Sequence, residues 1–182
     1  QIGARVLALD DTAAARTQRA AQRATQRATQ RAARRAVARV LAAEIALFEM
    51  KRDTEISVEA ASTLTANILS GRRYSPYWVQ FLIAGVDAGG GSVYSIDSAG
   101  GSIPDTYCAT GSGSPYMYGV LEDQYKEGMT RNEALKVTAR ALLASSQRDS
   151  ASGNGMDLAV ITMKDGFKLL TPAEKETLLK SI

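Results

Sequence analysis

Residues 109–122, ATGSGSPYMYGVLE, combine the residue types of a polar binding loop. Gly111 and Gly113 allow the backbone to approach a neighbouring group closely, and Ser112 places a hydroxyl between them. The Ser-Pro pair at 114–115 has the residue types of a helix N-cap and first turn. The pattern predicts either a capped turn before an amphipathic helix or a site that holds a polar group or anion by backbone N–H groups and the helix dipole. No Gly-Lys-Ser/Thr follows, so this is not a P-loop.

The composition limits which groups can act as a catalytic base. The chain contains no histidine, which excludes Ser-His-Asp catalysis, Cys-His catalysis and the usual zinc sites. Its single cysteine, Cys108, excludes an intrachain disulfide. If the chain belongs to a hydrolase, the base must be an amine, a lysine or a carboxylate.

The length and overall composition are those of one globular domain. The 182 residues are 45% apolar and 23% charged, which is ordinary for a soluble protein with a full hydrophobic core. No apolar run approaches the length of a membrane span, and the N-terminus lacks the apolar core of a signal peptide. We therefore expect a cytoplasmic protein without a membrane association.

Positive charge is concentrated at the amino end. Residues 1–40 hold nine arginines against Asp10 and Asp11, which is +7, so a whole-chain charge of +3 leaves −4 for the rest. Between residues 17 and 35 the chain is a near-repeat of TQRA without a large apolar side chain. We interpret residues 1–40 as an Arg/Gln/Ala-rich, low-complexity helical segment. A nucleic-acid-binding arm is the alternative, but aromatic residues for base stacking are missing.

The elements before the Ser112 loop are predicted as two helices and three strands. The apolar spacing from Val37 predicts a helix that ends near residues 51–53, and Ser57 is expected to cap a second helix that ends by Gly71. The run WVQFLIAGV, at 78–86, has the character of a strand buried on both faces. Glycine-rich turns separate it from a strand at 92–97 and from a third strand that ends at residue 110.

The second half repeats this order of helices and strands. Helices are predicted at 114–127 and from Thr130 to about 147, the latter opened by a capping box with Glu133. Strands at 156–163 and 167–170 follow, joined by an Asp-Gly turn, and residues 171–174 should cap a final helix. This order suits an α+β fold in which antiparallel sheets pack face to face with helices outside.

Three stretches together resemble the β-subunit of the archaeal-type 20S proteasome. They are YSIDSAGG at 94–101, ATGSGSP with YGVLE within 109–122, and QRDSASGNGMD with AVIT within 147–162, and NILSGRRYSPYWVQ at 67–80 is also similar. The resemblance covers residues 41 to 170, so we interpret 41–182 as a proteasome β-subunit-like domain. It implies the four-layer αββα sandwich of the N-terminal-nucleophile (Ntn) hydrolases.

The resemblance also implies a mechanism that needs no histidine. In this family an N-terminal threonine hydroxyl attacks the peptide carbonyl, and the α-amine of the same threonine acts as the base. An unperturbed α-amine has a pKa of about 8, close to what a general base needs at neutral pH. The implied function is a threonine endopeptidase that degrades unfolded proteins, without metal or cofactor, in stacked rings with other β-subunits and α-subunits.

Four residues match functional positions of that family. Ser112, Asp149 and Ser152 match the residues that hydrogen-bond and orient the threonine and its amine. Asp97 matches a position that helps line the substrate site of a neighbouring subunit. Each has a structural alternative, because Asp and Ser in loops also bond to nearby backbone N–H groups.

The amino end departs from the family pattern. The chain starts at Gln1 without the N-terminal threonine, and the repeat stands where the first two strands and a glycine-bearing segment are expected. We therefore expect an N-terminally incomplete or aberrant subunit, lacking the first strands and inactive as written, and neither Thr12 nor Thr17 is assigned as nucleophile. The alternative function is a non-catalytic structural ring subunit.

Overall fold

The computed structural model describes the backbone of residues 13–182 and the side chains of Thr29 and residues 32–182. Residues 1–12 of the predicted low-complexity segment lie outside the described residues, and the boundary at residue 40 stays a prediction. The helices are α2 (Ala13–Arg52), α3 (Val58–Ser70), α4 (Ser114–Gln124), α5 (Arg131–Arg148) and α6 (Pro172–Lys180). The strands are β1 (Phe81–Asp87), β2 (Gly90–Ile96), β3 (Ser102–Asp105), β4 (Ala159–Thr162) and β5 (Gly166–Leu169).

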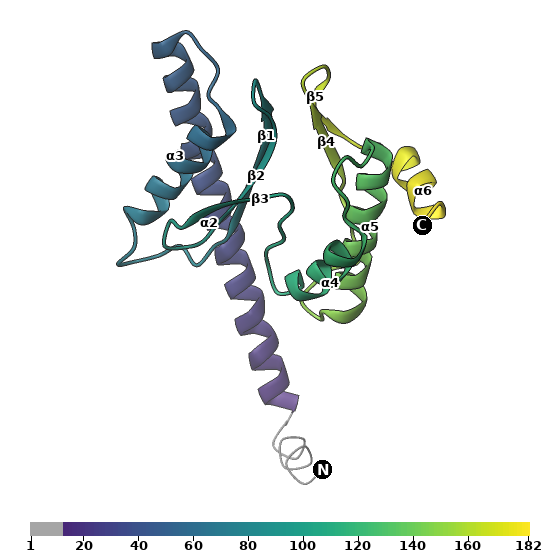
Figure 1. Ribbon diagram of the computed structural model, residues 1–182. Coiled ribbons are helices and arrows are strands. Elements are labelled where there is room, and N and C mark those ends of the chain that lie inside the picture. Colours follow the sequence, from purple (N-terminus) through teal and green to yellow (C-terminus); the bar gives the residue numbers. More distant parts are fainter. Residues whose placement is uncertain (1–12) are drawn as a thin grey trace.

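These elements form layers of helices, sheet, sheet and helices, as Figure 1 shows. Strands β1, β2 and β3 form one antiparallel sheet in that order, and β4 and β5 form a second. Strand β1 lies against β4, so the sheets meet in the middle. Helices α2 and α3 cover the outer side of the first sheet, and α5, with α4 and α6 beside it, lies outside the second. The predicted α+β class with antiparallel sheets is confirmed.

The first core cluster joins α2 and α3 to the first sheet. Its buried members are Val37, Ala66, Leu69, Val79 and Ile96. The end of the sheet also fixes where α3 begins, because a carboxylate oxygen of Asp87 accepts a hydrogen bond from the Val58 backbone N–H at 2.9 Å. Ser57 caps the same helix through the N–H of Ala60, as predicted.

The second core cluster joins α4 and α5. Its buried members are Ala109, Leu121, Val137 and Ala141. Two of them, Val137 and Ala141, are one turn apart on α5, so they form a stripe facing α4. The segment just before the Ser112 loop is therefore anchored in this core by Ala109.

The prediction of a strand buried on both faces at 78–86 was wrong. Strand β1 begins only at Phe81, and Trp78 is 75% exposed with a positive φ of 49°. Phe81 and Ile83 pack on the first core cluster, whereas Leu82, on the opposite face, is 41% exposed. The reason is packing, because only one face of this antiparallel sheet lies on the first core cluster beside α3.

Other predicted elements are shorter in the structure. Strand β3 ends at Asp105 rather than at residue 110, because the Asp105 carboxylate accepts from the Thr106 N–H at 2.7 Å and turns the chain. Helix α4 ends at Gln124 rather than 127, with Tyr125 already extended. Strand β4 begins at 159 rather than 156.

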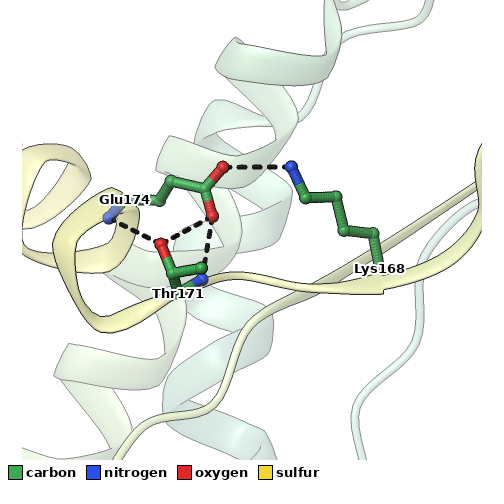
Figure 2. A network of polar contacts seen from close by, with 3 residues as sticks. All are labelled: Lys168, Thr171 and Glu174. Carbon is green, nitrogen blue, oxygen red and sulfur yellow. Dashed lines mark hydrogen bonds and ion pairs between the residues drawn. The ribbon is translucent and has the colours of Figure 1, made fainter.

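Both capping boxes are present as predicted. In the box before α6, the Thr171 hydroxyl accepts from the Glu174 N–H, and the Glu174 carboxylate accepts from the Thr171 N–H at 2.8 Å (Figure 2). Lys168 of β5 adds an ion pair at 3.1 Å. The Thr171 backbone N–H, followed by its hydroxyl and Lys168, lowers the pKa of the Glu174 carboxyl to about 2. In the part of the chain that the structure describes, none of the helices combines the length and apolar character needed to span a bilayer.

Candidate active site

Two loops bring three of the predicted site residues together. Ser112 lies in the loop before α4, and Asp149 and Ser152 lie in the loop after α5. The Ser112 hydroxyl donates to Asp149 Oδ2 at 2.6 Å, and the Ser152 hydroxyl donates to the same oxygen at 2.8 Å. The Ser112–Asp149–Ser152 cluster thus joins residues that are 37 positions apart in the sequence.

The end of α5 holds Asp149 in place. Asp149 is the C-cap residue, and its backbone N–H donates to the carbonyl of Ser145 at 2.8 Å. Its carboxylate also accepts from the Ala151 N–H at 3.1 Å through Oδ1, and its carbonyl accepts from the Ser152 N–H. The loop-shaping bonds expected of a structural Asp are therefore present as well. They occupy Oδ1 and the main-chain carbonyl oxygen, and they leave Oδ2 to the two hydroxyls.

Tyrosine side chains hold the segment that precedes Ser112 against α4. The Ala109 N–H donates to the Tyr118 hydroxyl at 3.1 Å, which closes the loop against α4. Tyr107 packs on Tyr118 and Tyr125 with ring centroids 6.4 and 4.9 Å away. These contacts place Ser112 at the surface, opposite the end of α5.

The start of α4 differs from its prediction. Gly113, without a side-chain cap, is the N-cap residue, and Ser114 is the first helical residue. The Ser114 N–H donates to the Gly111 carbonyl at 3.2 Å, the Tyr116 N–H donates to the Gly113 carbonyl at 3.1 Å, and Pro115 has no N–H. The N–H groups of Ser114 and Tyr116 are thus occupied by hydrogen bonds within the turn. The hypothesis of an anion held by backbone N–H groups of this loop stays a prediction.

The electrostatics favour an ionised carboxylate in the cluster. The hydrogen bond from Ser112, followed by those from Ala151 and Ser152, lowers the pKa of Asp149 below its ordinary value. Because the single proton of Ser112 is donated to Asp149, the oxygen of this exposed side chain retains only its capacity to accept. An exposed acceptor beside a half-buried carboxylate suits a donor with positive charge, such as an amine.

Asp97 lies apart from this cluster. It occupies the turn between β2 and β3, where its Oδ1 accepts from the N–H groups of Ala99 and Gly101 at 2.8 and 2.9 Å. Among the described residues no contact joins it to the cluster. Its structural alternative is therefore realised, and a role toward a neighbouring subunit stays a prediction.

Ser145 supports the cluster and was not predicted as part of the site, whereas a close approach of the backbone at Gly113 was expected. Ser145 on α5 is only 5% exposed, and its hydroxyl lies 2.9 Å from that of Ser152. A Cβ atom on Gly113 would collide with the Ser145 hydroxyl. The available signal was the helical spacing of Val137, Ala141 and Ser145, which places a serine on an apolar stripe. No group of three or more His, Cys, Asp or Glu side chains that could hold a metal occurs in the described residues.

Comparisons with known proteins agree with the resemblance. The chain matches the Proteasome subunit family over residues 14–161. It is 44% identical over 140 residues to a protein of Methanothermobacter thermautotrophicus, covering 77% of this chain and 67% of the relative. It is 46% identical over 140 residues to a protein of Thermoplasma acidophilum, and the match covers 77% of this chain and 66% of that relative. A protein of Methanosarcina thermophila is 50% identical over 134 residues, and the match covers 73% of this chain and 63% of that relative.

All three relatives are named "Proteasome subunit beta". The chain spans about two thirds of the length of these curated relatives. The matches confirm the resemblance inferred from the three sequence stretches, and they include both loops of the cluster within the family match. The chain therefore belongs to the proteasome subunit family, and within it to the β-subunits of the archaeal type.

Proposed function

We propose that this chain serves as a subunit of a 20S proteasome core and that its Ser112–Asp149–Ser152 cluster supports threonine-type endopeptidase chemistry. The observation that carries the proposal is the convergence of two hydroxyls on one Asp149 oxygen at the surface. The family match supports the same conclusion independently of the geometry. Unfolded polypeptides are the proposed substrates, and the cytoplasm is the proposed location.

The cluster would hold and orient the α-amine of an N-terminal threonine. The Ser112 oxygen accepts a hydrogen bond from that amine, and the Asp149 carboxylate lies next to it. When the amine takes the proton of the threonine hydroxyl, it becomes an ammonium, and the nearby negative charge stabilises that form. The hydroxyl oxygen is then free to attack a peptide carbonyl. No threonine of this sequence is assigned as that nucleophile.

The proposed partners are other β-subunits and α-subunits in stacked rings. The names of the relatives support this assignment, since each is a proteasome β-subunit. Asp97, in its exposed turn between β2 and β3, is the proposed contribution to the substrate site of a neighbouring subunit. Neither nucleic acid nor a membrane is a proposed partner, and the proposed chemistry uses no cofactor or metal.

Coexpression tests the assembly part of the proposal. The chain is produced together with a tagged archaeal proteasome α-subunit, and the purified complex is examined by electron microscopy. We expect the chain to copurify in stacked-ring particles, and the Thermoplasma acidophilum relative, prepared in parallel, serves as the control. A chain that stays separate while that relative assembles would contradict the proposal.

Substitutions in the cluster separate assembly from chemistry. Asp149→Asn retains the size of the side chain, and Asp149 lies in a surface loop, so this variant should still assemble. If the wild type and Asp149→Asn both assemble and the substitution changes no property of the particle other than the side chain itself, the non-catalytic ring subunit is the better account.

A further inference from the structure

Ser145 lies directly behind the Ser112–Asp149–Ser152 cluster. It belongs to the last turns of α5 and is 5% exposed, and its hydroxyl lies 2.9 Å from the Ser152 hydroxyl. Nearby hydroxyls on the same helix bond within the helix instead, since Ser146 donates to the Leu143 carbonyl at 2.9 Å. Ser145 thus reaches out of its helix toward the loop, which marks it as part of the cluster's support.

The proton count sets the direction of the Ser145–Ser152 hydrogen bond. A serine hydroxyl has one proton, and an ionised carboxylate can only accept. Ser152 donates its proton to Asp149 Oδ2 at 2.8 Å, so it must accept from Ser145. The result is a chain of donors from Ser145 through Ser152 to Asp149. Each bond in such a chain polarises the next and strengthens it.

Ser145 also contacts the loop that carries Ser112. The backbone of Gly113, next to Ser112, packs so closely on Ser145 that an added Cβ would collide with its hydroxyl and lie 3.0 Å from its Cβ. The same Cβ would lie 3.0 Å from the Ser152 hydroxyl. One buried side chain therefore supports the loops of both hydroxyls that bind Asp149.

We propose that Ser145 is a positioning residue of this site, which orients the Ser152 hydroxyl by donating to it and supports the Ser112 loop through Gly113. The inference rests on the proposed function, because it explains how the amine-holding cluster is kept in shape. Ser145 itself touches neither the amine nor a substrate. Its effect passes through Ser152 and through the backbone at Gly113.

The test uses the full chain and two readouts. The pKa of Asp149 is measured by carboxyl carbon NMR, and threonine amide, which carries a free α-amine and a hydroxyl, is titrated against the backbone amide signals of the Ser112 loop. The variants are Ser145→Ala and the matched control Ser146→Ala, whose hydroxyl bonds only within α5. Without the donor at 145, Ser152 binds the ionised carboxylate less firmly, which removes part of what lowers its pKa.

We expect Ser145→Ala to raise the measured pKa of Asp149 and to weaken threonine amide binding by about two- to fivefold, the scale of one lost hydrogen bond. Ser146→Ala should match the wild type in both. If Ser145→Ala does not fold, Ser145→Cys replaces it, because a thiol is a weaker donor of similar shape.

Each outcome separates the inference from the function on which it rests. An unchanged Asp149 pKa and unchanged binding in the variant at 145 would overturn the role of Ser145 and leave the amine-holding function intact. A raised Asp149 pKa, with no threonine amide binding even to the wild type, would support Ser145 as a positioning residue and contradict the amine-holding function.

Discussion

Asp149 accepts three hydrogen bonds through its carboxylate, two from hydroxyls and one from the Ala151 backbone. They stabilise the charged form, so the pKa of Asp149 is lower in the folded chain than in the unfolded one. Ser112 and Ser152 are thereby held at fixed positions on one oxygen. At this scale the site is a carboxylate with two oriented hydroxyls, and its properties can be tested one side chain at a time.

The lowered pKa of Asp149 makes stability depend on acid. A folded pKa below the unfolded value contributes stability that is complete above the unfolded value of about 3.8 and is lost as pH falls through the folded value. Wild type should therefore lose stability relative to Asp149→Asn as the pH is lowered below about 4. Urea unfolding across this pH range measures the difference. Asp123→Asn, at an exposed position on α4, serves as the control, and the same pH profile for both variants would refute the expectation.

Gly113 provides a second test at the residue scale. An alanine methyl at this position collides with the Ser145 hydroxyl, so Gly113→Ala should destabilise the chain by about 1–3 kcal/mol, as overpacking does. Gly119→Ala is the matched control, because a Cβ at this α4 position meets nothing within 4 Å and alanine favours a helix. Thermal unfolding compares the two. Equal stability of the two variants would contradict the prediction, because it would mean that the loop accommodates the added methyl group without a loss of unfolding free energy.

The helix ends show which parts of an element the sequence can predict. The caps at Ser57, Thr130 and Thr171 were predicted correctly, because a cap is a local pattern of a few residues. The N-cap expected at Ser114 was wrong, because Gly113 takes that place in a loop packed on Ser145 and Ser152. Local patterns fail where tertiary packing decides the backbone.

Strand burial and the site depend on longer-range information. The apolar run at 78–86 does not reveal that β1 lies at a sheet edge with one exposed face. The cluster joins two loops that periodicity cannot pair, so only the resemblance to a family predicted that Ser112, Asp149 and Ser152 belong together. Ser145 escaped prediction because a serine on an apolar stripe has no motif of its own.

The capping box of α6 gives a test at the scale of the element (Figure 2). Thr171→Ala removes the hydroxyl that accepts from the Glu174 N–H and should cost about 0.5–2 kcal/mol. It should also raise the pKa of Glu174 from about 2, since the hydroxyl is one of the groups that lower it. Thr177→Ala, whose hydroxyl bonds back to the Ala173 carbonyl inside α6, is the control. Chemical unfolding measures the stability, and NMR titration measures the pKa of Glu174. The prediction is contradicted if Thr171→Ala matches the wild type and Thr177→Ala in both quantities.

Among the described residues, two buried clusters lie on either side of the paired sheets. Leu69 belongs to the cluster between α2, α3 and the first sheet, and Val137 belongs to the cluster between α4 and α5. The two clusters share no residue among those described, and the sheets meet where β1 lies against β4. Such an arrangement allows each half to open locally without the other.

Hydrogen exchange can test this division. Leu69→Ala removes a side chain that is 1% exposed and should destabilise its own half by about 2–5 kcal/mol. We expect amide protection to fall in α3 and β2 while α5 retains most of its own. Val137→Ala is the matched change in the second cluster, and it should lower amide protection in α5 while α3 and β2 retain most of theirs. An equal loss of protection in both halves from either variant would show that the molecule opens only as one unit.

The most direct test of the central claim is whether the Ser112–Asp149–Ser152 cluster binds a threonine α-amine. Threonine amide is titrated into the isotope-labelled chain, with N-acetylthreonine amide, which lacks the free amine, as the matched ligand. We predict saturable shifts of the backbone signals of Ser112 and Asp149 with the free amine, none with the acetylated ligand, and loss of binding in Asp149→Asn. Equal shifts with both ligands, or binding that survives Asp149→Asn, would contradict the account.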